Sequence, residues 1–261
     1  MSPHEGFHWR IWAAEGAATF LLVFAGLSAV CLDFGRGSPL VSLVPPHSVR
    51  LLLTGVLFSA CNSLLAVSPL GRLSGAHLNP AVTLAFRALG RVGDHDLAGY
   101  VAVQLFGALA GAATLRLVWG SVATSIDGGA TEWTVSAPVA FALEVAMTGL
   151  LIAVILLFVS SERLARWTPL ALWPLIAALV WAGGSYTGTS LNPARSAGPA
   201  LVFGVPGPLW LYLAAPTTGA LAVALAWPLR PKTAKLFHDP RYACSLASEL
   251  PVQAAAASSA R

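Results

Sequence analysis

Asparagine side chains occur in two copies of one motif, and their amides could bind a small polar molecule. The copies begin at Ser74 and Thr187, and both follow the pattern hydroxyl residue, Gly, any two residues, Leu, Asn, Pro, Ala. The Asn-Pro-Ala triplets are Asn79, Pro80 and Ala81 in the first copy and Asn192, Pro193 and Ala194 in the second. An asparagine amide donates through two N–H groups and accepts at its oxygen. Two such amides side by side would suit water or a neutral hydroxyl compound.

Each motif also carries the signals that start a short helix. Asparagine is a favoured N-cap, and proline suits the first helical position. The apolar run after Asn79 ends at Gly90, and the run after Asn192 ends near Gly204. Helices of about 11 or 12 residues would be about 16–18 Å long, roughly half of a hydrocarbon core about 30 Å thick. A single copy would suggest only a capped helix, but two matching copies favour a site built from discontinuous membrane helices.

The composition is that of an integral membrane protein. Of the 261 residues, 56% are hydrophobic and only 10% are charged, and the mean hydropathy is +0.73. A soluble domain would carry about 25% charged residues. The net charge of +4 comes from scattered Lys and Arg, which gives no continuous basic face for nucleic acid. The three cysteines and six histidines show no metal-type spacing, so neither a metal nor a cofactor is predicted.

Six apolar runs have the length of a membrane-spanning helix. They cover residues 11–32, 51–67, 97–115, 139–159, 167–187 and 208–229. Each half of the chain then reads as two spans, a short helix and a third span. Three spans per half make the second half enter the membrane from the opposite side, so the halves, about 9–119 and 138–229, form an inverted repeat. We expect one transmembrane domain over residues 1–230 and a disordered cytoplasmic tail over 231–261.

Basic residues in the short loops predict the orientation, because cytoplasmic loops are enriched in Lys and Arg. Arg87, Arg91, Arg163 and Arg166 fall on one side, together with the basic start of the tail. The opposite loop, 120–137, has two acidic residues and no Lys or Arg. Both termini are therefore expected to be cytoplasmic, in a multi-pass protein of the plasma (inner) membrane.

Three charged residues lie within the apolar part of the chain. Glu15 and Glu144 occupy matching places in the two halves, each in the pattern Glu-x-x-x-Thr. Arg195 is the one charged residue between Thr168 and Leu229. A charge at mid-membrane costs about 2.5–3.5 kcal/mol even on the lower scales, so it normally faces water or a polar partner. We interpret Arg195 as lining an aqueous pore, and the alternative is that it snorkels or pairs with Glu144.

These features together resemble the aquaporin, or major intrinsic protein, family over about residues 9–230. The resemblance rests on both Asn-Pro-Ala triplets, on Arg195 directly after the second triplet, on Glu15 and Glu144, and on the six spans. It implies an all-α membrane protein with an aquaporin-like right-handed bundle of six transmembrane helices and two half-helices. It also implies one pore per subunit, a homotetramer, and Glu15 and Glu144 as supports behind the pore loops. No Ser/His/Asp arrangement, metal cluster or phosphate loop stands out in the sequence, so we expect no enzymatic activity.

The resemblance further implies a narrow ring of four residues that selects the permeant. Counting back from the motifs without gaps places this ring at Ser59, Val180, Thr189 and Arg195. Water-selective members typically have an aromatic residue and a histidine at the first two positions, so Ser59 and Val180 would widen the ring. Phe58 is adjacent, and a one-residue gap would restore an aromatic there. Ser196 stands where glycerol facilitators usually have Asp, which favours a water-type channel.

We therefore expect a passive channel for water in the lipid bilayer, with small uncharged solutes as additional permeants. A glycerol- or urea-type facilitator is the first alternative. The second is a proton-coupled secondary transporter that uses Glu15 or Glu144, although the predicted spans hold no further acid to complete a relay. Gly107 and Gly111, four residues apart, are expected to serve close helix packing.

Overall fold

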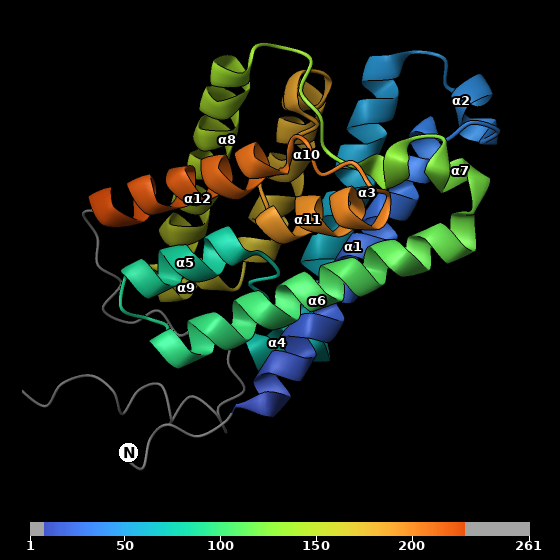
Figure 1. Cartoon of the computed structure of the whole chain (residues 1–261). Coiled ribbons are helices and arrows are strands. Elements are labelled where there is room, and N and C mark those ends of the chain that lie inside the picture. The colour runs from blue at the N-terminus through green and yellow to red at the C-terminus, as the bar shows by residue number, and fades with distance from the viewer. Residues whose placement is uncertain (1–7, 228–261) are drawn as a thin grey trace, which may run out of the picture.

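The computed structural model describes residues 8–227, and six long helices dominate it (Figure 1). All six are long and apolar enough to cross a membrane. They are α1 (Trp9–Phe34), α3 (His47–Val67), α6 (Asp94–Trp119), α8 (Ala137–Val159), α10 (Thr168–Thr187) and α12 (Leu209–Ala226). The six predicted spans are thus confirmed, with ends that differ by up to four residues.

The two motifs begin short helices, as predicted. Helix α5 (Pro80–Ala88) has nine residues, and helix α11 (Pro193–Val202) has ten. Asn79 and Asn192 are their N-caps, and each side chain accepts a hydrogen bond from the first turn of its own helix. The glycines expected to end the helices, Gly90 and Gly204, follow within two residues and have positive φ.

Several shorter helices occur in the connections, where only loops were expected. They are α2 (Pro39–Leu43), α4 (Pro69–Ser74), α7 (Ser121–Thr124), the 3-10 turn η1 (Asp127–Gly129) and α9 (Glu162–Ala165). In α2 and α4 a serine N-cap and a proline in the first turn explain the local start.

The packing of the helices repeats between the two halves. Helix α1 packs against α3 and α6, and α8 packs in the same way against α10 and α12. Helix α5 lies against α12, whereas α11 lies against α6. Two further contacts, α3 with α10 and α5 with α11, join equivalent elements of the two halves. Each half-helix thus packs against a long helix of the other half, as expected for an inverted repeat. This packing brings the two half-helices together at the centre (Figure 1).

Glycines allow the closest of these helix contacts. A Cβ atom on Gly107 of α6 would lie 2.4 Å from the carbonyl oxygen of Gly16 in α1, and one on Gly111 would lie 2.7 Å from that of Phe20. In the other half, a Cβ on Gly219 of α12 would lie 2.3 Å from the carbonyl oxygen of Val145 in α8. Because small residues let membrane helices approach closely, both interfaces depend on the missing side chains.

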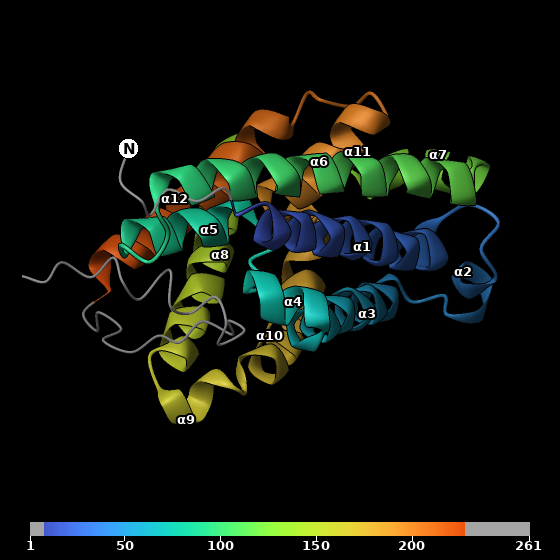
Figure 2. The same ribbon diagram turned by 90° about the horizontal axis from the view of Figure 1, so that it is seen from below.

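The connecting elements are spread along the bundle. Helices α2 and α7 lie at one end, α5 and α9 lie on the opposite side, and α4 lies between them, near the middle of the view (Figure 2). The predicted tail, 231–261, and the outermost parts of the predicted domain, 1–7 and 228–230, lie outside the described residues.

Candidate functional site

A cavity of about 350 Å³ runs between the two halves of the bundle. On α3, both His47 and Ala66 line it. These residues lie close to the two ends of the helix, so the lined length is about 28 Å at 1.5 Å per residue. The cavity therefore extends over nearly the thickness of a hydrocarbon core, which is about 30 Å.

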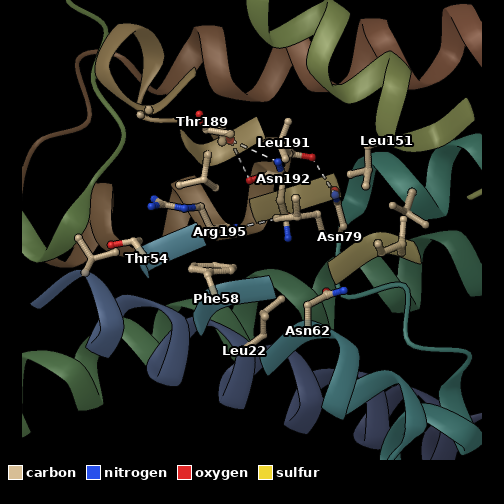
Figure 3. Close-up of a pocket in the computed structure, with 18 of the residues that line it drawn as sticks. Leu22, Thr54, Phe58, Asn62, Asn79, Leu151, Thr189, Leu191, Asn192 and Arg195 are labelled. Atoms are coloured by element: carbon tan, nitrogen blue, oxygen red, sulfur yellow. Dashed lines mark hydrogen bonds between the residues drawn. The ribbon is translucent and has the colours of Figure 1, made fainter. Parts of the chain in front are cut away.

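The two motif asparagines meet inside this cavity and contact each other's loops reciprocally (Figure 3). The Nδ2 group of Asn79 donates to the carbonyl oxygen of Leu191 at 2.8 Å, and that of Asn192 donates to the carbonyl oxygen of Leu78 at 2.7 Å. Each Oδ1 accepts from the third residue of the triplet, at 2.9 Å from Ala81 N and 3.0 Å from Ala194 N. Since an amide carries two N–H groups, each asparagine keeps one donor for a molecule in the cavity.

The loops before the asparagines adopt the same unusual backbone. Ala76 and Leu78 have φ values of 49° and 54°, and their counterparts Thr189 and Leu191 have 47° and 57°. A left-handed conformation at a residue other than glycine costs of order 1–3 kcal/mol and persists only where the surroundings hold it. Both loops line the cavity, so this backbone shapes the site directly.

Glu15 and Glu144 hold these loops from behind. Both are fully buried, and neither lines the cavity. Glu15 Oε1 accepts from the Leu78 N–H and, at 2.8 Å, from Gln104 Nε2. Glu144 accepts from Ser190 N at 2.8 Å, from Leu191 N at 3.1 Å and from the Thr187 hydroxyl at 2.7 Å. Each carboxylate thus binds the leucine N–H directly before its motif asparagine.

Arg195 lies in the cavity wall next to the asparagine pair. It is 7% exposed, and its Nη1 donates to the carbonyl oxygen of Gly129 at 2.9 Å. Within residues 8–227 the side chains at ion-pair distance are Arg87 with Asp94 and, if His8 is protonated, His8 with Asp96, so Arg195 and Glu144 do not pair there. The guanidinium faces the cavity, where the remaining N–H groups can donate to a solute.

Three of the four residues predicted for the narrow ring line the cavity, and one does not. Val180, Thr189 and Arg195 are in the wall. Ser59 does not line the cavity. It is fully buried among neighbouring residues, and its hydroxyl donates to the carbonyl oxygen of Gly55 at 2.5 Å. Phe58 lines the cavity in its place, and Arg195 Cζ lies 5.8 Å from the centre of its ring. The ungapped count for Ser59 is therefore corrected to Phe58.

Helical periodicity explains this correction. Leu51, Thr54, Phe58 and Asn62 all line the cavity, and they recur on α3 at spacings of three and four residues. Successive residues on a helix are turned by about 100°, so Ser59 points away from the face that Phe58 shares with Thr54. A one-residue difference in the connection between α3 and the motif is enough to shift the count.

Several polar residues of the cavity wall were missed by the sequence analysis, and His77 and Asn62 are two of them. His77 is part of the first motif, and its Nδ1 lies 3.1 Å from the hydroxyl oxygen of Thr83. Its ring stacks on that of Phe86, with 5.0 Å between the ring centres. Asn62 belongs to neither motif. Its spacing of four residues from Phe58 could have indicated that Asn62 lines the cavity. That reasoning requires Phe58, and not Ser59, to be the residue of α3 in the wall.

Comparison with known proteins assigns the family. The family model described as major intrinsic protein matches residues 4–227. Aquaporin NIP1-1 of Zea mays is 35% identical over 83% of this chain and 73% of its own length. Aquaporin NIP3-1 of Arabidopsis thaliana is 32% identical over 86% of this chain and 68% of its own length. Nodulin-26 of Glycine max is 32% identical over 81% of this chain and 74% of its own length.

The fold has a counterpart among solved structures. The X-ray structure of the aquaglyceroporin from Plasmodium falciparum matches with a TM-score of 0.67 at 22% identity, over 85% of this chain and 96% of that chain. The chain belongs to the major intrinsic protein, or aquaporin, family, and it is a non-enzymatic, multi-pass membrane channel.

Proposed function

We propose that this protein is a passive channel for water that also admits small uncharged solutes. The observation that carries the proposal is the meeting of Asn79 and Asn192 in one cavity that follows α3 for most of its length. Each amide retains an N–H group for a passing oxygen atom. A water molecule or a hydroxyl compound can accept both hydrogen bonds as it crosses the centre.

The electrostatics of the cavity favour neutral permeants. Two helix N-termini meet at the asparagines, and each is equivalent to roughly half a positive charge. Arg195 adds a full positive charge in the wall. The lining residues include no Asp or Glu within the described part of the chain, so nothing acidic there offsets this potential. Cations, including hydrated protons, are repelled on this basis.

The proposed constriction consists of Phe58, Val180, Thr189 and Arg195. Arg195 donates hydrogen bonds, whereas the Val180 side chain has no polar atom and a smaller volume than the histidine typical of water-selective members. Phe58 and Val180 together give the ring an apolar part that can face the carbon atoms of a solute. For this reason a glycerol- or urea-type facilitator remains the second candidate function.

Nothing in the cavity favours proton-coupled transport through Glu15 or Glu144. Both carboxylates lie outside the cavity and accept hydrogen bonds from the loops. A carrier for protons would need contact with the aqueous path. Their arrangement supports a positioning role for the loops instead.

The orientation and assembly are also proposals. Arg72, Arg87 and Arg163 belong to α4, α5 and α9, which lie away from the end that holds α2 and α7 (Figure 2). By the positive-inside rule, the side of the membrane that these residues face is cytoplasmic, and both termini then lie in the cytoplasm of a cell whose plasma (inner) membrane holds the protein. The homotetramer follows from the family resemblance, and the molar mass of the detergent-solubilised protein, corrected for bound detergent, tests it.

Reconstitution into proteoliposomes tests the channel function. Vesicles with the wild-type chain should shrink in a sucrose gradient several-fold faster than empty vesicles of the same lipid and size. An Asn192→Leu variant, matched for the amount of protein, should fall toward the empty-vesicle rate because it loses a central donor. Wild-type rates equal to those of empty vesicles would reject the proposal. Parallel uptake of urea and glycerol distinguishes a water channel from a solute facilitator.

A further inference from the structure

Asn62 is one of several polar side chains in the cavity wall that belong to neither motif. Asn62 follows Phe58 on α3 by four residues, about one helical turn or 6 Å along the axis. Phe58, Asn62 and, a turn further, Ala66 all line the cavity. Figure 3 shows the Asn62 side chain reaching from α3 into the cavity near Asn79. An amide therefore stands between a phenyl ring and a methyl group on this wall, at the level of the motif asparagines.

The Asn62 amide is free to bind a permeating molecule. Its side chain is partly exposed, and it forms no hydrogen bond with any residue in the range 8–227. An unbonded amide offers two N–H donors and an oxygen that accepts. A polar group held away from bulk water without a partner is unfavourable, so a partner inside the cavity is expected.

The motif asparagines leave a different set of groups. Their oxygens already accept from the N-termini of α5 and α11, and one N–H of each is bound to the opposite loop. Asn192 therefore keeps only a donor, because its oxygen accepts from both Ala194 N and Arg195 N, and Asn79 keeps a donor and one acceptor site on its oxygen. The nearby wall residues Leu22, Val82 and Leu151 have no polar side-chain atom, so they supply no acceptor.

This difference separates water from larger solutes. A water molecule can accept from the asparagines and donate its own hydrogens to the water before or behind it. A solute such as urea or a short polyol fills the cross-section and carries several N–H or O–H groups, some of which point sideways. Those groups need an acceptor in the wall, because an unpaired donor in a narrow site is costly.

We propose that Asn62 is a specificity-determining residue of the channel, whose amide oxygen accepts from solutes with several N–H or O–H groups while they bind the motif asparagines. The permeants it favours are small neutral amides and polyols. The inference deepens the proposed function and rests on it, since Asn62 matters only if the cavity conducts.

Asn62→Leu tests the proposal, because leucine has a similar volume and no polar atom. Urea and glycerol uptake should fall about tenfold, because N–H or O–H groups of the solute are left without an acceptor. Osmotic water permeability should stay within about twofold of the wild-type value, so the solute-to-water permeability ratio falls. Asn62→Ala, which removes the amide without adding bulk, should also lower this ratio. Asn62→Gln keeps an amide and should retain most of the solute uptake. Leu64→Ala on the outer side of α3, where Leu64 is 67% exposed, is the matched control and should leave both rates unchanged.

The outcomes separate this inference from the channel function. Wild-type vesicles that conduct water but exclude urea and glycerol would overturn the role of Asn62 and leave the water channel standing. An unchanged permeability ratio in both Asn62→Leu and Asn62→Ala would overturn it as well. Wild-type vesicles no faster than empty ones would overturn the channel and, with it, this inference. Elution of each variant as a single peak in detergent shows that the comparison uses folded protein.

Discussion

The guanidinium of Arg195 lies against the ring of Phe58, with 5.8 Å between Arg195 Cζ and the ring centre. The two residues come from opposite halves of the chain, one from α11 and one from α3. A cation this close to an aromatic face is attracted to it. The pair therefore joins the halves at the cavity wall and holds the charged and the aromatic side of the proposed constriction at a set separation.

Phe58 and Ser59 differ in their contact with the cavity, and their variants should differ in transport. We expect Phe58→Ala to raise glycerol uptake several-fold, because it removes the largest side chain of the proposed constriction. Ser59→Ala should leave water and glycerol permeability unchanged, since the Ser59 hydroxyl binds the Gly55 carbonyl within α3. Stopped-flow light scattering on matched proteoliposomes measures both. A stronger effect at Ser59 than at Phe58 would contradict the corrected position.

Arg195→Ala should make the channel less selective. It removes a long side chain and a positive charge from the wall, so urea uptake should rise several-fold and a proton leak should appear. Arg195→Lys keeps the charge but loses the planar fork of donors, and it should show the larger urea uptake with little proton leak. A pH-sensitive dye inside the vesicles records the leak. Unchanged selectivity in Arg195→Ala would remove this residue from the proposed constriction.

Glu144→Gln should disturb the loop before Asn192 more than Glu15→Gln disturbs the loop before Asn79. The N–H groups of Ser190 and Leu191 go to different oxygens of Glu144, so a glutamine would set its NH₂ group against one of them. Leaving such a donor unpaired costs about 1–3 kcal/mol. The hydrogen bonds that Glu15 accepts from the Leu78 N–H and from Gln104 Nε2 both end on Oε1, so a glutamine can keep these two. Thermal unfolding in detergent and water permeability should both fall further for Glu144→Gln, and equal losses would argue against this geometry.

Gly107→Val should destabilise the bundle. Its Cβ would meet the Gly16 carbonyl oxygen at 2.4 Å, which forces α1 and α6 apart. Overpacking of this kind costs about 1–3 kcal/mol or more. Gly93→Ala is the control, because a Cβ there meets nothing within 4 Å and the residue has negative φ. A lower unfolding temperature for Gly107→Val alone is expected, and similar temperatures for both variants would show that the interface tolerates the change.

Local patterns were sufficient for the elements of the fold. Span length follows from the thickness of the membrane, and the start of each half-helix follows from Asn79 or Asn192 as an N-cap with proline after it. Those signals lie within a few residues of each other along the chain. The sequence alone therefore determined the six spans and the two half-helices, and it also singled out Arg195 as a charge without local partners.

The tertiary structure decided which side of each helix faces the cavity. Packing of α3 between α1 and α10 sets its rotation, and a turn of about 100° per residue exchanges Ser59 for Phe58 and brings Asn62 into the wall. The partner of Arg195, the Gly129 carbonyl, lies in a distant loop and has no sequence pattern. These features depend on contacts between remote segments, and such contacts exist only once the two halves have packed together.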